Sequence, residues 1–524
     1  MARISALQSI ACVVIAVLAY WVLVLKPPVI QSDDDIDVLS VCSPTGTTPI
    51  QNRLFETLGI APVRAVHWRG HYRFVLKLNE PVIVENSPAA NWTAHGRWDP
   101  DFISTYPASF KSVHVSNNSH FVYSRPEDTP FPWANTRDKF PSYATTTMAA
   151  SDFFEICHTA AGSERRFAYY SGQAIFEDSP DFLTDVTPYR QFVIESALVG
   201  MNDFAQANVW LGCAGVTAQL HYDSSYNFYT QIFGQKMFIL FPPGYADCVD
   251  LEPVAHPSYR QSQMMDLATL TSSQLNSLQE CGARRGLGAP KHVTLQPGQT
   301  LFLPAFWLHY VRACTTSISV NVWTNSHSLG VADELMRHPV PVELSWTIDQ
   351  FFGGFVAYVG CVDTAAFATK RNCTQLRDIS RMVNSGSHPI SRIYLQRWRP
   401  LFAGLFEPGS DQIVNTSFCA AVFQSAASQS FVTLPNITCS FMSQAQFGSP
   451  AQMEHLVVSS KRAGRIAQLE RNPEILRLLL DNYYDQLFGQ LLQVRLRPRN
   501  EVPLEDWTFC VLHRLYTELQ ATMA

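Results

Sequence analysis

The sequence predicts a mainly β core, folded as a double-stranded β-helix (a jelly roll) with flanking helices, between an N-terminal transmembrane helix and an α-rich C-terminal region. Three observations lead to this fold class. Short apolar runs separated by turn residues dominate residues 190–330, as is typical of strands. A long apolar run stands near the N-terminus, and residues 453–496 carry apolar side chains at helical spacing. We therefore divide the chain into an anchor (1–28), a linker (29–50), the jelly-roll domain (51–340) and the C-terminal region (341–524).

The expected strands of the jelly roll are short and mostly apolar. Closing such strands into a double sheet removes most free edges and encloses a pocket. A strand-like pattern also spans Tyr72 to Val84, and Ala149 to Ala160 has helical character. The expected core strands are Asn208 to Leu211, Thr217 to His221, Asn227 to Ile232, Lys236 to Phe241, Gln299 to Pro304, Leu308 to Arg312 and Ser317 to Trp323.

The C-terminal region is expected to be helical. The helical spacing from Met453 to Leu496 is interrupted by Pro473, which predicts two helices. A further helix is expected from Leu504 to Met523. An apolar stripe on such helices usually faces its own domain, so we interpret it as intramolecular core and keep an interface as the alternative.

The apolar run near the N-terminus extends from Ile4 to Leu25 and ends at Lys26. Its roughly 22 residues are long enough to cross a hydrocarbon core of about 30 Å. A cleavable signal peptide has a shorter apolar core and a small-residue cleavage site, so we favour an uncleaved anchor over secretion after cleavage. Arg3 before the run and the aspartates 33–35 after it favour a cytoplasmic N-terminus. The remaining chain is then lumenal, in the endoplasmic reticulum or Golgi.

Sequons and cysteines are compatible with that placement. Five Asn-x-Ser/Thr sequons begin at Asn91, Asn117, Asn372, Asn415 and Asn436, so we expect a glycoprotein. The chain has twelve cysteines, one of them in the apolar run. Candidate disulfides are Cys248 with Cys281, Cys361 with Cys373, and Cys419 with Cys439. The alternative is that several are buried thiols, and we interpret Cys213 and Cys314 in this way.

Composition bears on the class of partner. Charged residues make up 16% of the chain, below the roughly 25% typical of soluble proteins. The chain can therefore form a large apolar core. The formal net charge is −6, and no cluster of lysine and arginine is present in the sequence. Binding to the phosphates of nucleic acid requires such a cluster, so we expect no nucleic-acid partner.

The strongest chemical signal is His221-Tyr222-Asp223, with a further histidine at His309. Residues i and i+2 of a strand share a face, so His221 and Asp223 can bind one ion while Tyr222 turns away. His309 must then come from another strand. Two imidazoles and one carboxylate suit a non-haem Fe(II) centre with open coordination positions. A lone His-x-Asp pair is weak evidence, because such a pair is also expected by chance.

Lys236 strengthens the signal. It alternates with Phe238 and Leu240 in an otherwise apolar strand. Burying an unpaired ammonium group is costly, so this lysine needs an anionic partner. A dicarboxylate cosubstrate would supply that anion.

These residues and their surroundings resemble the JmjC/cupin-like family of Fe(II)- and 2-oxoglutarate-dependent oxygenases, and most of all its asparaginyl-hydroxylase-like branch. The resemblance covers residues 75–330 and several motifs. They are Gly215 to Asp223, Asn227-Phe228-Tyr229, Gly234-Gln235-Lys236, Phe241-Pro242-Pro243, the connecting segment His256 to Gln263, Leu295 to Gln299, Leu301 to Pro304, Trp307-Leu308-His309 and Ser319 to Trp323.

The resemblance implies that His221, Asp223 and His309 bind Fe(II) and that Lys236 binds the distal carboxylate of 2-oxoglutarate. The other implied cosubstrate or pocket residues are Asn227, Thr217, Tyr229, Asn321, Tyr170, Trp210 and Trp323. Tyr169 is an equal alternative to Tyr170. Many relatives carry the threonine three residues before the first histidine, where this chain has Ala218. The resemblance also leaves open a homodimer through C-terminal helices.

The function expected from these observations is hydroxylation of a side chain of a protein substrate in the secretory pathway. A catalytically inactive cupin-fold binding protein at the membrane is the first alternative. An N-methyl demethylase of the JmjC type is the second, because it would use the same metal residues.

Overall fold

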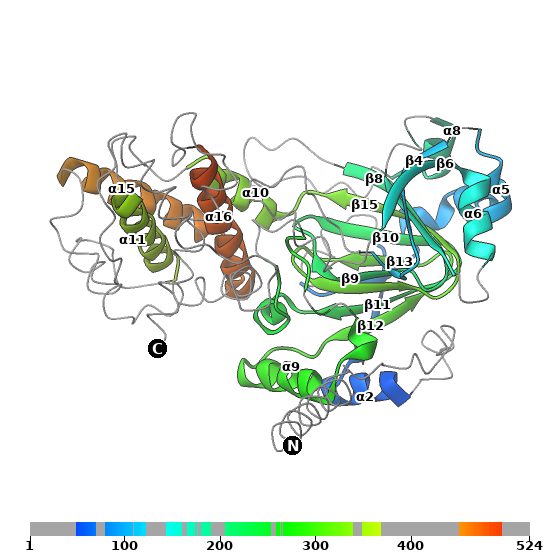
Figure 1. Cartoon of the computed structure of the whole chain (residues 1–524), viewed down its shortest axis with the longest axis horizontal. Helices are drawn as coiled ribbons and strands as arrows, with labels where there is room; N and C mark the ends of the chain where they lie inside the picture. The colour runs from blue at the N-terminus through cyan, green and yellow to red at the C-terminus, as the bar shows by residue number, and fades with distance from the viewer. Residues whose placement is uncertain are drawn as a thin grey trace, which may run out of the picture.

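Two β-sheets face each other and form the core of the molecule (Figure 1). The computed structural model describes residues 49–69, 79–107, 109–121, 143–159, 165–172, 176, 180–189, 205–252, 258–262, 264, 266–338, 348–367 and 450–494. Within this part of the chain, one sheet has six strands and the other has nine.

The six-stranded sheet contains β9 and β14, which carry the histidines of interest. Its strands, in spatial order, are β1 (Ala61–Pro62), β12 (Lys291–Leu295), β11 (Lys236–Phe241), β14 (Leu308–Ala313), β9 (Thr217–Tyr222) and β5 (His120–Phe121).

The nine-stranded sheet faces it. Its strands, in spatial order, are β2 (Ala65–His67), β3 (Val82–Glu85), β13 (Thr300–Leu303), β10 (Tyr226–Phe233), β15 (Ser317–Thr324), β8 (Ala205–Gly212), β7 (Phe167–Gly172), β4 (Ser109–Ser116) and β6 (Ala144–Ala149).

Alternation along the strands separates an inner from an outer face. In β10, Phe228 packs into the cluster outside the nine-stranded sheet, whereas Tyr229 packs between the sheets. In β11, Phe238 and Leu240 point inward while Ile239 points outward. This period of two is intrinsic to the pleated strand, so the residues between the sheets come from every second position.

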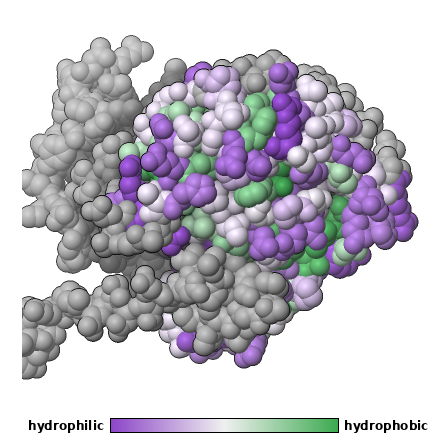
Figure 2. Space-filling view, turned by 90° about the vertical axis from the view of Figure 1, so that its right-hand side faces the viewer, coloured by the Kyte–Doolittle hydropathy of each residue, from purple (hydrophilic) through white to green (hydrophobic). Residues whose placement is uncertain are grey.

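Helices cover both outer faces. On the nine-stranded sheet, α5 (Pro100–Ser104), α6 (Ala150–His158) and α8 (Pro180–Asp185) contribute apolar side chains to the outer cluster. On the six-stranded sheet, α2 (Pro49–Leu58) and α9 (Ser272–Arg284) do the same. Figure 2 shows one face of the molecule, where hydrophobic areas are small and lie among hydrophilic side chains. The apolar side chains that these helices contribute are packed against the two sheets.

Further helices lie at the opposite end of the molecule from α5 and α6 (Figure 1). They are α10 (His327–Met336), α11 (Ile348–Phe367), α15 (Pro450–Ala467) and α16 (Pro473–Val494). Asn472 caps α16, since its side-chain oxygen accepts from the N–H groups of Glu474 and Ile475 at 2.9 and 3.3 Å. Ile475 and Leu478 of α16 join the apolar cluster outside the six-stranded sheet, so α16 packs on the β core of its own chain.

The mainly β jelly-roll core and its flanking helices are confirmed. Each of the seven expected core strands is present, with ends that differ by a few residues, and the expected helix at 149–160 is α6. The two helices divided at Pro473 are α15 and α16. Strand β12 was missed, because its five residues begin with Lys291 and His292 and carry too short an apolar pattern.

The expected N-terminal transmembrane helix and the expected helix at 504–523 lie outside the described residues. Within the residues described, no helix has both the length and the apolar character needed to cross a membrane.

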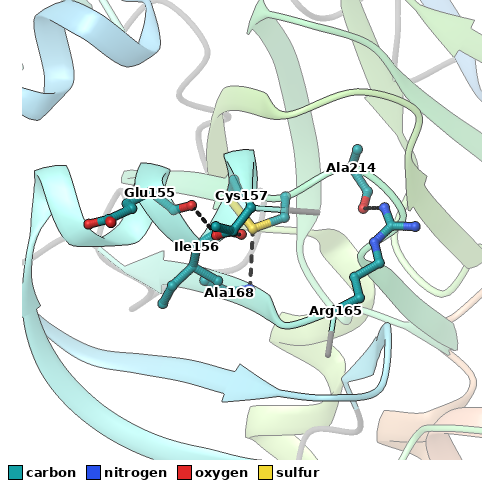
Figure 3. The surroundings of a disulfide bond; sticks show 8 residues. Glu155, Ile156, Cys157, Arg165, Ala168 and Ala214 are labelled. Carbon is teal, nitrogen blue, oxygen red and sulfur yellow. Dashed lines mark hydrogen bonds between the residues drawn. A yellow bond between two sulfur atoms is a disulfide. The ribbon is translucent and has the colours of Figure 1, made fainter. Parts of the chain in front are cut away.

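Two disulfides join elements that are distant in sequence. Cys248, at the end of the 3-10 helix η5 (Pro243–Cys248), is bonded to Cys281 of α9, as expected. Cys157 of α6 is bonded to Cys213 after β8 (Figure 3). The Ala168 N–H donates to the Cys213 sulfur at 3.3 Å, and the Arg165 guanidinium donates to the Ala214 carbonyl at 3.1 Å. This disulfide therefore holds α6 against the strands β7 and β8.

The interpretation of Cys213 and Cys314 as buried thiols was wrong, because both are disulfide-bonded. Strand-like apolar surroundings do not distinguish a thiol from half of a disulfide. Cys361 is also disulfide-bonded, whereas its expected partner Cys373 and the expected pair Cys419 and Cys439 lie outside the described residues.

Candidate metal centre and anion site

Strand pairing brings the two histidines together. His221 near the end of β9 lies directly opposite His309 of β14, and their ring centroids are 4.1 Å apart. Asp223 follows β9, and its Oδ2 is 3.7 Å from His309 Nε2. One ligand atom from each of the three residues lies within 4.8 Å of the others. The arrangement provides two nitrogens and one carboxylate oxygen for a single ion, as the i, i+2 spacing predicted.

Backbone carbonyls orient both imidazoles. His221 Nδ1 lies 2.7 Å from the Gln219 carbonyl, and His309 Nδ1 lies 3.1 Å from the Trp307 carbonyl. A carbonyl oxygen can only accept, so each Nδ1 carries the proton and donates. The Nε2 lone pairs are thereby left for a metal ion, which is the usual arrangement of a metal-bound histidine.

The electrostatics of His221 and Asp223 favour metal binding. Burial, followed by the nearby His309, lowers the pKa of His221 to about 4. Burial alone would raise the pKa of Asp223, but His309, His221 and Arg260 outweigh burial and lower it. At neutral pH, His221 is therefore neutral and Asp223 is ionised, which are the protonation states that metal ligation requires.

A line of amides lies on the inner face of the nine-stranded sheet. The Asn321 side-chain oxygen accepts from Asn208 Nδ2 at 3.1 Å and from Trp210 Nε1 at 2.7 Å. The Asn321 Nδ2 donates to Asn227 Oδ1 at 3.0 Å. Asn321 is fully buried, so these bonds satisfy groups that would otherwise be costly to bury. The network fixes the Trp210 indole as part of the pocket wall.

Trp323 interacts both with Trp210 and with the metal ligand Asp223. Its ring is 5.9 Å from that of Trp210 in an edge-on arrangement. Within the described part of the chain, its indole N–H has no partner at normal hydrogen-bond geometry. The indole nevertheless lies close enough to Asp223 to contribute to the lowered pKa of that carboxyl group.

Lys236 lies deeper between the sheets. Its side chain is 3% exposed, and its Nζ donates to the Tyr229 hydroxyl at 2.7 Å. Burial lowers the pKa of Lys236 to about 7. Among the residues described, no carboxylate forms an ion pair with this lysine. A buried ammonium with only a neutral hydroxyl partner is a site prepared for an anion.

The anion site and the metal site lie on the same inner face of the six-stranded sheet. Lys236 lies opposite Ala313 of β14, and Leu240 lies opposite His309 of the same strand. The four-residue offset corresponds to roughly 13 Å along the strand at about 3.3 Å per residue. The inner face of this strand pair carries Lys236, Phe238, Leu240 and His309. The lysine side chain together with an anionic ligand can therefore span the distance between the two sites.

The structure corrects the prediction of Tyr170. The Tyr170 ring stacks on Phe110 at 4.8 Å, in the apolar cluster outside the nine-stranded sheet. Tyr169 faces inward instead: its ring is 6.1 Å from Trp210, and burial together with the charges of Tyr229 and Asp223 raises its pKa. The cause is strand alternation, which places only one of two adjacent tyrosines in the pocket.

Thr217 also lies away from the pocket. The pairing of β9 with β14 is shifted between His309 and Val311, so Ala218 lies opposite Val311 and Thr217 lies opposite Arg312. Thr217 therefore shares the outer face with Arg312, and its hydroxyl donates to the Gly215 carbonyl at 2.9 Å. The irregularity inserts one extra residue in β9, which reverses the face expected from regular alternation.

Sequence reasoning missed several residues near the site. Gln231 and Ser319 are buried and joined by a 2.9 Å hydrogen bond. Each lies two residues from a predicted site residue, Tyr229 or Asn321, so the period-two rule was a sufficient signal.

Arg260 and Gln261 were treated only as part of a connecting segment. Gln261 forms a β-bridge with His221. Arg260 has a positive φ of 65°, and its charge acts on both His221 and Asp223. No sequence signal indicates that this segment passes the metal ligands, because the bridge is a tertiary contact.

Comparisons with known proteins agree with this geometry. A family model described as a cupin-like domain matches residues 69–328. Lysine-specific demethylase JMJ30 of Arabidopsis thaliana is 24% identical over 249 residues, which are 47% of this chain and 50% of that protein. Lysine-specific demethylase 8 of Xenopus tropicalis is 25% identical over 262 residues, 49% of this chain and 50% of that protein.

A third relative is HSPB1-associated protein 1 of Homo sapiens, 31% identical over 153 residues, which are 29% of this chain and 28% of that protein. The chain thus spans about half the length, or less, of these curated relatives. The matched region contains each residue of the metal and anion sites, and it ends before α11, α15 and α16.

Metal binding can be tested directly with Mn(II) added to the purified full chain. Replacing the carboxylate in Asp223→Ala removes one of three ligands, so we expect Mn(II) affinity to fall by at least 100-fold in calorimetry, at the upper end of losses for residues around a metal. Asp185→Asn is the matched control, because it removes a buried carboxylate paired with Arg97 and Trp98. Wild-type Mn(II) affinity in Asp223→Ala would exclude this centre.

Proposed function

Because residues 69–328 belong to the cupin-like JmjC family of Fe(II)- and 2-oxoglutarate-dependent oxygenases, we propose that this protein hydroxylates a side chain of a protein substrate in the secretory pathway. The observation that carries the proposal is the pairing of His221, Asp223 and His309 with a buried lysine that has no carboxylate partner among the described residues. A metal alone would not need Lys236. A metal with an anionic cosubstrate does.

The residues present fit both cofactors of the family. His221, Asp223 and His309 would hold Fe(II), and Lys236 with Tyr229 would hold one carboxylate of 2-oxoglutarate. The space between the metal ligands and the lysine would be lined by Asn227, Asn321, Trp210 and Trp323. Tyr169 would take the place predicted for Tyr170. When bound, these cofactors supply oxidation by O2: 2-oxoglutarate loses CO2 to give succinate, which takes one oxygen atom, while the other enters a C–H bond of the substrate.

The chain contributes geometry and exclusion of water. The strand pair β9 and β14 would supply all three metal ligands, His221, Asp223 and His309, from one side, a ligand set that suits a non-haem iron. Apolar side chains, among them Phe238, Leu240 and Leu303, surround Lys236 between the sheets. Excluding water from this cavity strengthens the attraction between the ammonium group and a carboxylate.

A catalytically inactive binding protein is the less favoured alternative. Such a protein would gain nothing from three intact ligand groups, of which His221 is neutral and Asp223 is ionised at neutral pH. It would also carry the cost of the buried lysine, which lowers the free energy of unfolding unless an anion binds.

The second candidate reaction is N-demethylation, the reaction after which two of the relatives are named. Arg260 argues against it in this chain. The positive charge of Arg260 contributes less than burial and His309 to the lowered pKa of His221, and less than the two histidines to that of Asp223, so a cation lies near the metal ligands. A methylated lysine or arginine is itself a cation and would be repelled there. A neutral or acidic target side chain is therefore favoured.

The proposed location is the lumen of the endoplasmic reticulum or Golgi, with a membrane anchor at residues 1–28. Disulfides persist in oxidising compartments, and the described residues include the bonds Cys157–Cys213 and Cys248–Cys281. The partners we propose are a protein substrate and the membrane, without nucleic acid. A homodimer would have to use helical surfaces other than the Ile475 and Leu478 face of α16.

Lys236 predicts how cosubstrate affinity depends on pH. Burial sets the pKa of Lys236 in the ligand-free protein at about 7, and a carboxylate partner raises this pKa in the complex. Above pH 7, binding of 2-oxoglutarate therefore requires the uptake of a proton that the free lysine has lost. Affinity for 2-oxoglutarate in the Mn(II)-loaded protein should be constant below pH 7 and weaken by about tenfold per pH unit above it. Calorimetry between pH 6 and 9 measures this dependence. In Lys236→Arg the dependence should disappear, since a guanidinium stays protonated; equal slopes in both proteins would refute the role.

The substrate class can be tested by mass spectrometry. The full chain is incubated with secretory proteins, Fe(II), ascorbate and 2-oxoglutarate, and products are examined for added oxygen or lost methyl groups. We expect a gain of one oxygen on neutral or acidic side chains, and none with Asp223→Ala. In Arg260→Glu, selection against cationic side chains should weaken because the charge is reversed. Removal of methyl groups from lysine or arginine would contradict the assignment.

The location is tested with a tag at the C-terminus of the full chain. An antibody should reach the tag only after internal membranes are permeabilised, and Cys157 and Cys213 should be alkylated only after reduction. A lumenal marker and a cytosolic marker serve as controls. Access after permeabilisation of the plasma membrane alone would rule out the lumenal placement.

A further inference from the structure

Tyr222, the middle residue of His221-Tyr222-Asp223, makes a contact outside the matched region. Its side chain is 1% exposed and points away from the metal ligands into the cluster outside the six-stranded sheet. Its hydroxyl lies 2.9 Å from Asn482 Oδ1 and 2.6 Å from Asn482 Nδ2. Asn482 belongs to α16, 260 residues further along the chain.

The Tyr222 ring also joins the two segments that carry the metal ligands. It stacks on Phe306, with ring centroids 5.4 Å apart and an interplanar angle of 24°. Phe306 has a positive φ of 65°, a conformation that bulky residues rarely adopt, and its N–H donates to the Asp223 carbonyl at 2.8 Å. Phe306 precedes His309 by three residues. A shift of Tyr222 would therefore displace Asp223 and the start of β14.

Two polar contacts anchor the start of helix α16, ahead of Asn482. The Glu474 carboxylate accepts from the Gly244 N–H at 3.1 Å, and Arg477 pairs with Asp247 at 2.9 Å. Ile475, Leu478 and Asn482 follow the i, i+3, i+7 spacing of one helix face. The first two are apolar and pack on the sheet. An asparagine continues the stripe at the point where the Tyr222 hydroxyl lies.

A leucine at position 482 would continue the stripe without needing a polar partner, but it would leave the Tyr222 hydroxyl without this amide. We propose that Asn482 is a positioning residue of the metal centre: it fixes the Tyr222 ring and thereby holds Asp223 and Phe306 in place. The inference rests on the proposed function, because it assigns a role toward the same metal site. It makes α16, which lies beyond the matched cupin-like region, part of the catalytic unit.

The test compares metal affinity with stability in the full chain. Asn482→Leu restores an apolar stripe, so the thermal midpoint should be kept or raised, while Mn(II) affinity falls by about tenfold, the lower end for residues that orient metal ligands. Tyr222→Phe should give a similar loss, and the double variant should be no weaker than either single one. The visible absorption of bound Co(II) should shift in the same variants, because ligand geometry changes.

Glu474→Ala is the matched control, since it removes a different hydrogen bond of α16 and should leave Mn(II) affinity unchanged. Wild-type Mn(II) affinity and an unchanged Co(II) spectrum in Asn482→Leu would overturn this inference alone. Additive losses in the double variant would overturn it as well, because the two residues would then act independently. A folded wild-type chain that binds no Mn(II) would overturn the proposed function and this inference with it.

Discussion

The antiparallel pairing of β9 with β14 is the constraint on which the site depends. It places His221 opposite His309 and fixes their ring centroids at 4.1 Å. The irregularity one step further along the pair then turns Thr217 to the outer face. Since β14 also pairs with β11, the same register sets the distance from His309 to Lys236. A shift of one residue in this pairing would move a ligand to the wrong face of the sheet.

Charge balance in the barrel follows from that register. The metal end carries one carboxylate and two imidazoles, whereas Lys236 lies at a distance among apolar side chains. Between them, the Asn321 amide donates to Asn227 and accepts from Asn208 and Trp210, so its own hydrogen bonds are made within the protein. The three metal ligands therefore need a cation, and Lys236 at the other end needs an anion. Few ligands other than a metal with a chelating dicarboxylate meet both.

The C-terminal helices act on this site from outside. Ile475 and Leu478 of α16 share an apolar cluster with Tyr222 and Phe306, both of which adjoin metal ligands. A second contact joins Ser328 of α10 to Glu470 in the turn between α15 and α16 at 2.5 Å. The matched cupin-like region ends at residue 328, within the first turn of α10 and before α15 and α16.

The sequence by itself indicated seven of the core strands, since period-two alternation and turn residues are local properties, but it missed β12. It also indicated the three candidate metal ligands and the buried lysine. Only the tertiary structure decided which of Tyr169 and Tyr170 faces the pocket, because the face depends on register. It also decided the position of Arg260 and the contact of Asn482 with Tyr222. These are contacts between segments far apart in the chain, and such contacts leave no local pattern in the sequence.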